Sequence, residues 1–212
     1  MLQNQKEIII LTRNPEKYIS SPQYQYVYWD GKTTKDIEKW LNGEYVIINL
    51  AGENLSGSHL FDMHWSKERK KSILESRLNS GKVITEAVYS AHEKPTLVIQ
   101  ASAIGYYGSS LLGKIFTEES PPGDDFLARV CTQWENSTAT IEKLGIRRVV
   151  IRIGIVLSRQ GGALPKQVLP FQFFLGGRIG SGKQWYSWIH ILDVVNAIKF
   201  IIDNQQMSGV YN

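Results

Sequence analysis

Residues 97–102 read LVIQAS, a short run of mostly apolar residues that ends in a small polar side chain. Such a run is typical of a strand whose two faces are both buried in a parallel sheet. Residues 8–11 (IIIL), 45–50 (YVIINL) and 149–156 (VVIRIGIV) have the same character, and residues 209–212 (GVYN) look like the start of a fifth strand. We therefore predict four buried strands spread along the chain, with a fifth beginning at its end.

Segments with helical periodicity separate these runs. Apolar side chains recur at helical spacing in residues 34–41, 65–91 and 124–145, and another helical pattern follows Asp193, which we expect to cap it. Strands that alternate with helices favour an α/β fold, a doubly wound parallel sheet with helices on both faces. Ligands of such sheets bind beyond the carboxyl ends of the strands. No repeat or low-complexity tract divides the chain, so we expect one domain over residues 1–212.

Composition excludes several classes of protein. The chain has 212 residues, of which 24 are basic and 20 acidic, giving a net charge of +4 without the concentrated basic stripe of a nucleic-acid binder. The single cysteine, Cys131, cannot close an intramolecular disulfide, which favours a reducing, cytoplasmic setting. No apolar run approaches the roughly 20 residues that span a bilayer. The four histidines lack metal-ligand spacing, so we expect no metal site.

Six segments together form a recognisable pattern. They are NLAGEN (49–54), WSKERKKSILESR (65–77), SAIGYYG (102–108), EESPPGDDFLARVCTQW (118–134), RIGIVLSR (152–159) and LPFQFFLGGRIGSGKQWYSWIHILD (169–193). In these segments the chain resembles the "epimerase family protein" branch of the atypical extended short-chain dehydrogenase/reductases, which is related to NAD-dependent epimerases and dehydratases. The segments occur in the family's order and extend over nearly the whole chain.

The resemblance implies a Rossmann-type domain that binds NADP(H). The implied activity is that of an oxidoreductase or nucleotide-sugar epimerase-like enzyme with a small-molecule substrate of the sugar-nucleotide kind, and a homodimer is left open. The alternative is a non-catalytic NADP(H) sensor or scaffold, since some relatives carry a cell-division label. Neither alternative involves nucleic acid or a membrane.

Three departures from the family pattern bear on this reading. Relatives open with a strand and a glycine-rich turn, whereas the first glycine here is Gly31, so we expect the chain to lack that first strand and the loop that cradles the pyrophosphate. Relatives also continue past Asn212 into a substrate region that we expect to be absent. We therefore expect a partial domain that binds cofactor weakly. Finally, the places of the superfamily's Tyr-x-x-x-Lys pair hold Leu127 and Cys131.

The candidate catalytic residues are Ser102, which ends the strand predicted at residues 97–102, and Tyr106 and Tyr107, which follow it. A serine there can hold a substrate carbonyl or hydroxyl group, and a neighbouring phenol can donate a proton. Without a lysine partner, a tyrosine with a pKa of about 10 is a poor base at neutral pH. The alternative is that both tyrosines pack as aromatic walls.

The candidate cofactor residues follow the predicted strands. Thr12 and Arg13 come directly after residues 8–11, with no acidic residue before Glu16, and an arginine at this place accommodates the 2′-phosphate of NADP. A solvated arginine at a strand end is the simpler alternative. The resemblance adds further cofactor contacts, which are Asn49, Leu50, Ala51, Gly52, Lys71, Ser76, Arg152 and Ile155.

Residues 177–184 (GRIGSGKQ) come close to a phosphate-binding loop. They end in Gln184 where the motif has a serine or threonine that binds Mg²⁺, and they follow an aromatic segment instead of a strand. We expect a substrate loop at this place and no nucleoside triphosphatase.

Overall fold

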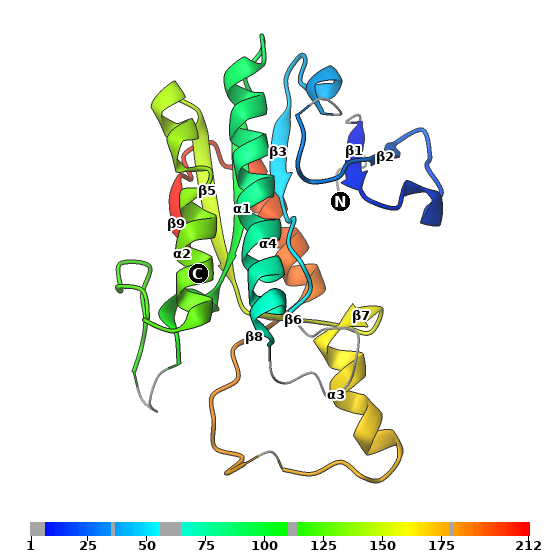
Figure 1. Ribbon diagram of the computed structural model, residues 1–212, viewed down its shortest axis with the longest axis vertical. Coiled ribbons are helices and arrows are strands. Elements are labelled where there is room, and N and C mark those ends of the chain that lie inside the picture. The colour runs from blue at the N-terminus through cyan, green and yellow to red at the C-terminus, as the bar shows by residue number, and fades with distance from the viewer. Residues whose placement is uncertain (1–6, 35–36, 56–64, 110–113, 179) are drawn as a thin grey trace.

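The computed structural model describes residues 7–34, 37–55, 65–109, 114–178 and 180–212. Figure 1 shows a central sheet with helices on both faces, a small strand pair beside it and a third small sheet below. The described strands are β1 (Ile8–Thr12), β2 (Tyr24–Tyr28), β3 (Val46–Asn49), β4 (Leu97–Ala103), β5 (Arg147–Ile153), β6 (Ile155–Ser158), β7 (Gly161–Gly162), β8 (Trp188–His190) and β9 (Gly209–Tyr211). The helices are α1 (Lys67–Ser90), α2 (Phe126–Asn136), α3 (Ala163–Gln172) and α4 (Ile191–Asp203), and 3₁₀ helices are η1 (Pro15–Lys17), η2 (Glu38–Trp40), η3 (Ile104–Tyr107) and η4 (Ala139–Leu144).

The central sheet has the strand order β3-β4-β5-β9, and all its pairs are parallel. Along β4, side chains alternate between two cores. Leu97 and Ile99 pack against Val194, Ile198 and Ile201 of α4, whereas Val98 on the other face packs against helix α1 and the η4 segment. The parallel α/β fold expected from the sequence is therefore confirmed, with both faces of this sheet covered by helices (Figure 1).

Strand β1 lies in a different sheet from β3 to β5. Within the described residues it pairs in parallel only with β2, an element that the sequence analysis missed. Leu11 of β1 and Ala51 after β3 nevertheless pack in one apolar cluster with Val83 and Ala87 of α1. The β1–β2 pair is thus attached to the central sheet through side chains on α1.

The predicted strand at residues 149–156 is two strands. It breaks at Gly154, whose backbone passes so close to Ser187 that a Cβ at Gly154 would lie 2.9 Å from the Ser187 carbonyl oxygen. Beyond this point β6 pairs with β7 and β8 in a separate small sheet that carries α3. The sequence analysis did not identify β8 or α3.

Three helix predictions need correction. Residues 34–41 contain only η2 among their described positions, and the segment 124–145 divides into α2 and η4, with Gly145 in the left-handed conformation at a φ of 74°. The N-cap of α4 is His190, whose Nδ1 accepts from the amide of Leu192, so Asp193 lies in the first turn instead of capping it. Among the described helices, none is long and apolar enough to cross a membrane.

Candidate functional site

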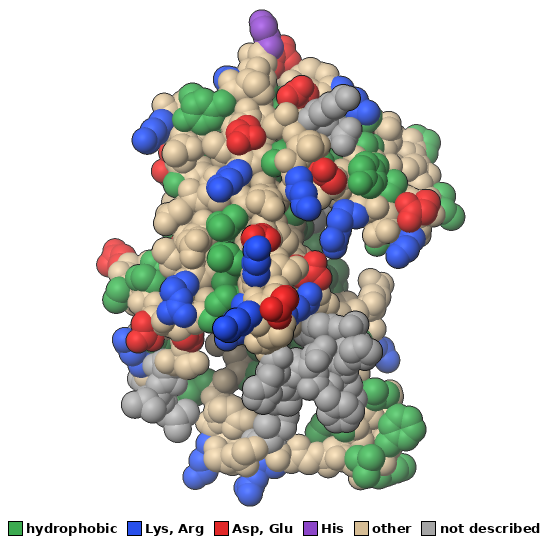
Figure 2. Space-filling view, viewed as in Figure 1, with side chains coloured by type: hydrophobic (Ala, Val, Ile, Leu, Met, Phe, Trp, Pro, Cys, Tyr) green, Lys and Arg blue, Asp and Glu red, His purple; other side chains and the backbone are tan. Residues whose placement is uncertain are grey.

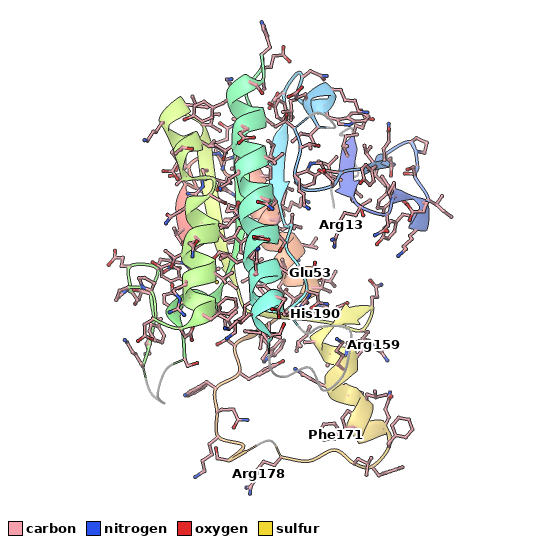
Figure 3. The ribbon with its side chains drawn as sticks, viewed as in Figure 1. Arg13, Glu53, Arg159, Phe171, Arg178 and His190 are labelled. Atoms are coloured by element: carbon pink, nitrogen blue, oxygen red, sulfur yellow. The ribbon has the colours of Figure 1, made fainter. Side chains whose placement is uncertain are left out.

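Glu53, a residue that the sequence analysis did not select, connects the ends of β1 and β3. Its Oε2 lies 3.7 Å from Arg13 Nη2 and its Oε1 lies 3.1 Å from Arg69 Nη1. Figure 3 shows Arg13 and Glu53 facing the same space beside α1. The structure therefore brings the residue after β1, the loop after β3 and the first turn of α1 to one place.

Helix α1 holds the backbone of this loop. Ser76 Oγ accepts from the amide of Glu53 at 2.9 Å, and Arg77 Nη1 donates to the Glu53 carbonyl oxygen at 3.1 Å. Gly52 leaves little room for a side chain, because a Cβ would lie 3.0 Å from the Arg77 Cζ and this guanidinium would have to move slightly. Burial lowers the pKa of the Arg77 guanidinium. We call Arg13, Gly52, Glu53, Arg69, Ser76 and Arg77 the Glu53 cluster.

The Glu53 cluster carries three guanidinium groups and one carboxylate. Arg13 is 71% exposed, and the Nε of Arg69 is buried without a hydrogen-bond partner among the described residues. Figure 2 shows Lys and Arg side chains, with some acidic ones between them, gathered on the face over α1. An exposed guanidinium beside a second, incompletely paired one fits the chemistry of a phosphate group.

Four other predicted cofactor residues, near the ends of β1 and β3 or on α1, differ in exposure and in their contacts. Asn49 is only 2% exposed, and its Nδ2 donates to Gln100 Oε1 of β4 at 2.9 Å, so its side chain is used within the sheet. Leu50 is 59% exposed. Lys71 forms an exposed pair with Glu75 one turn along α1, and the Thr12 hydroxyl accepts from the amide of Asn14.

The three predicted catalytic residues belong to a second cluster around Glu135 of α2. Ser102 Oγ donates to Glu135 Oε1 at 2.6 Å. Arg152 of β5 donates from Nε to Oε1 at 2.9 Å and from Nη2 to Oε2 at 3.0 Å, so the carboxylate is held at both oxygens. Ser102, Glu135 and Arg152 are all buried. We call these residues together with Tyr106 and Tyr107 the Glu135 network.

Arg152 also connects both tyrosines to Glu135. Its Nη1 donates to the Tyr107 hydroxyl at 2.9 Å, and that hydroxyl lies 2.7 Å from Asn212 Oδ1 at the end of β9. The guanidinium lies 3.4 Å from the centroid of the Tyr106 ring. Desolvation disfavours the charge on Arg152, but hydrogen bonds to Glu135 and Tyr107 outweigh it and raise the pKa of this arginine.

Cys131 of α2 lies near Ser102 and Glu135 of one cluster and near Arg77 of the other. Together with Leu127 it lies against η3, where a Cβ on Gly105 would be 3.5 Å from Leu127 Cβ and 3.7 Å from the Cys131 sulfur. Burial raises the pKa of the Cys131 thiol to about 11. A buried, protonated thiol at this place cannot perform the role of the missing lysine.

Ile155 and the loop at 177–184 lie away from these two clusters. Ile155 begins β6, is 36% exposed and donates its amide to Ser187 O. The described part of residues 177–184 has no helix or strand, and Ile179 lies outside the described residues. Arg178 of this segment and Phe171 of α3 are labelled in Figure 3, below the central sheet.

Comparison with known proteins agrees with this architecture. The sequence model of the NAD dependent epimerase/dehydratase family matches residues 1–212. The chain belongs to this epimerase/dehydratase family. "Epimerase family protein SSP1921" of Staphylococcus saprophyticus is 39% identical over 214 residues, which cover 100% of this chain and 68% of that protein.

Two solved structures of the epimerase family superpose well. The human epimerase family protein SDR39U1 (isoform 2), determined with NADPH, has a TM-score of 0.76 at 30% identity over 97% of this chain and 65% of its own. The nucleoside-diphosphate sugar epimerase from Corynebacterium glutamicum has a TM-score of 0.75 at 32% identity, over 98% of this chain and 46% of its own. The chain thus spans about two thirds or less of these proteins. The Rossmann-like fold implied by the resemblance is confirmed.

Proposed function

We propose that the protein binds NADP(H) at the carboxyl edge of β1 and β3 and belongs to an oxidoreductase or epimerase-like enzyme acting on a small molecule. The observation that supports this most is the position of Arg13. It follows a parallel strand, is largely exposed and faces the loop after β3, where a ribose 2′-phosphate can be recognised. The NADPH in the human relative supports the same cofactor.

The residues of this chain suit the adenosine side of that cofactor. Arg13 and Arg69 would meet the 2′-phosphate, and Leu50, Ala51 and Gly52 would line the adenosine ribose, because a glycine permits close approach of the backbone. The bound nicotinamide supplies hydride transfer. Of the two tyrosines, Tyr106 is the better proton-transfer group, because Tyr107 already hydrogen-bonds with Arg152 and Asn212.

Substitution of Arg13 tests this proposal directly. Arg13→Gln should weaken NADPH binding about 10- to 100-fold, the value of a charge-assisted hydrogen bond to phosphate, and leave NADH binding unchanged. Calorimetric titration of both cofactors measures this. Lys17→Gln, which removes the same charge from exposed η1, is the matched control. Equal effects of Arg13→Gln on NADPH and NADH would contradict the proposal.

A specific observation favours a second function, a non-catalytic NADP(H) sensor. Ser102 and Tyr107 are committed to the Glu135 network, and Leu127 and Cys131 offer no acid–base group. Turnover of NADPH with a panel of carbonyl compounds and sugar nucleotides separates the two functions. Turnover that Tyr106→Phe abolishes supports the enzyme, whereas NADPH binding without turnover on any member of the panel supports the sensor.

A further inference from the structure

We infer that the Glu53 carboxylate is an internal stand-in for a phosphate. Arg13 and Arg69 form a two-guanidinium clamp for the 2′-phosphate of the nucleotide, and that phosphate binds by displacing Glu53. This inference rests on the proposed NADP(H) function and deepens it. It adds Arg69 as a phosphate ligand and makes Glu53 the residue that sets the affinity for 2′-phosphorylated nucleotides.

The geometry of the carboxylate carries the inference. Glu53 presents one oxygen to each arginine, Oε1 to Arg69 and Oε2 to Arg13, and these two arginines come from elements far apart in the sequence. A phosphate bridging two guanidiniums would place its oxygens in the same way. The carboxylate therefore marks the position at which an anion is held between β1 and α1.

The attachment of Glu53 allows its side chain to leave. Its backbone is fixed on α1 by Ser76 and Arg77, whereas its carboxylate pairs with Arg13 and Arg69. The side chains of Glu53 and Arg69 are each 26% exposed, so solvent reaches the pair. Rotation of the Glu53 side chain would free Arg13 Nη2 and Arg69 Nη1, while Arg69 Nη2 keeps its hydrogen bond to the Asn54 carbonyl oxygen and the loop stays in place.

Charge favours the exchange. The pair between Glu53 and the 71% exposed Arg13 is screened by solvent, so it holds the carboxylate only weakly. A phosphate monoester carries nearly twice the charge of a carboxylate and has three acceptor oxygens. The third arginine is not part of the clamp, because Arg77 donates to the carbonyl oxygens of Glu53 and Ile73 and lies over the Trp134 ring.

Two nucleotides that differ only in the 2′-phosphate, 2′,5′-ADP and 5′-AMP, are the probes. Glu53→Gln removes the competing charge and should raise the affinity for 2′,5′-ADP about fivefold while leaving that for 5′-AMP unchanged. Arg69→Gln should lower the affinity for 2′,5′-ADP about tenfold, again without effect on 5′-AMP. Glu86→Gln, at an exposed position near the other end of α1, removes the same charge as Glu53→Gln and is the matched control.

The outcomes separate the clamp from the wider function. The ratio of the affinities for 2′,5′-ADP and 5′-AMP decides whether the clamp exists. If this ratio is the same for Glu53→Gln as for Glu86→Gln, or if Arg69→Gln leaves it unchanged, the proposed clamp is contradicted even where both nucleotides bind. If neither nucleotide binds the unmodified protein or any variant, the proposed NADP(H) function is wrong as well. Circular dichroism confirms that each variant is folded, and the opposite signs expected for Glu53→Gln and Arg69→Gln exclude a general loss of structure as the cause.

Discussion

Glu135 is a buried carboxylate whose two oxygens are both engaged by Arg152, and it also accepts from Ser102. Replacing it with glutamine removes the negative charge and leaves the buried guanidinium of Arg152 uncompensated. We expect Glu135→Gln to lower the free energy of unfolding by about 3–5 kcal/mol, the cost of breaking a buried ion pair at one partner. Urea denaturation monitored by circular dichroism measures the change.

The sequence offers a matched control for this variant. Glu75 pairs with Lys71 on α1 at 3.7 Å, and both of these side chains are more than half exposed. Glu75→Gln should therefore change the free energy of unfolding by no more than about 1 kcal/mol. If the two substitutions lower the free energy of unfolding equally, burial of the Glu135–Arg152 pair adds nothing to the stability lost when its carboxylate is neutralised.

Cys131 is a second residue whose burial determines the reactivity of its side chain. Burial raises its pKa from an ordinary 9.0 to about 11, so at pH 8 the thiolate population falls about 100-fold. We expect the native protein to react with a disulfide reagent at least that much more slowly than the urea-unfolded chain. Stability should also fall as pH rises from 9 towards 11, because only the unfolded chain then releases the thiol proton. Equal reaction rates for native and unfolded protein would contradict the buried, protonated state.

At the scale of elements, helices α1 and α2 approach each other through Gly81. A Cβ at this position would lie 1.8 Å from Ser137 Oγ and 2.6 Å from Ser137 Cβ. Glycine to alanine in a helix ordinarily stabilises by about 0.5–1 kcal/mol, but here we expect Gly81→Ala to destabilise by about 1–3 kcal/mol because the helices must move apart. Thermal unfolding followed by circular dichroism measures the difference.

The neighbouring position shows whether this effect comes from helix packing. Lys82 is exposed on the same turn of α1, and Lys82→Ala should change stability by no more than about 0.5 kcal/mol. Adding Ser137→Gly to Gly81→Ala removes the clashing atoms and should restore part of the lost stability. A Gly81→Ala protein as stable as the original would mean that the two helices do not meet at this contact.

The elements also show what sequence can and cannot predict. The run at residues 97–102 identified β4 because a strand buried on both faces has a local signature of its own. The break at Gly154 depends on a distant backbone, that of Ser187, so the run at residues 149–156 gave no sign of it. The first residue of a helix is also hard to predict when two nearby side chains can both cap it. For α4 the sequence favoured Asp193 as the cap, whereas in the structure the cap is His190.

The Glu135 network and the Glu53 cluster also differ in how far the sequence predicts them. Glu135 could have been found from the sequence, because it lies four positions after Cys131 and so falls on the apolar face of α2. A buried carboxylate needs a charged partner, and an arginine within a buried strand, such as Arg152, is a candidate for that partner. Glu53 had no such signal. It stands in a loop, and only the tertiary fold brings Arg13 and Arg69 to it. The predicted contacts of individual residues with cofactor stay predictions.

At the scale of the whole molecule, the division into sheets predicts uneven stability. Strand β4 is paired on both edges and almost fully buried, whereas β1 is half-buried and pairs within the described residues only with β2. A two-stranded sheet alone is marginal in water. We expect amides of β1 and β2 to exchange with deuterium through local openings at least about 2 kcal/mol below those of β4 and β5. Native-state hydrogen exchange resolved by residue measures this.

Leu11 connects the two levels of stability, because it is the residue of β1 that packs with Val83 and Ala87 of α1. Leu11→Ala should therefore lower the protection of β1 and β2 while leaving that of β4 and β5 unchanged. If the substitution instead lowers protection equally in all four strands, β1 and β2 unfold only together with the central sheet. In that case the two sheets would unfold as one cooperative unit. The side-chain cluster on α1 alone would couple them, because β1 and β2 share no backbone hydrogen bonds with β4 and β5 in the described structure.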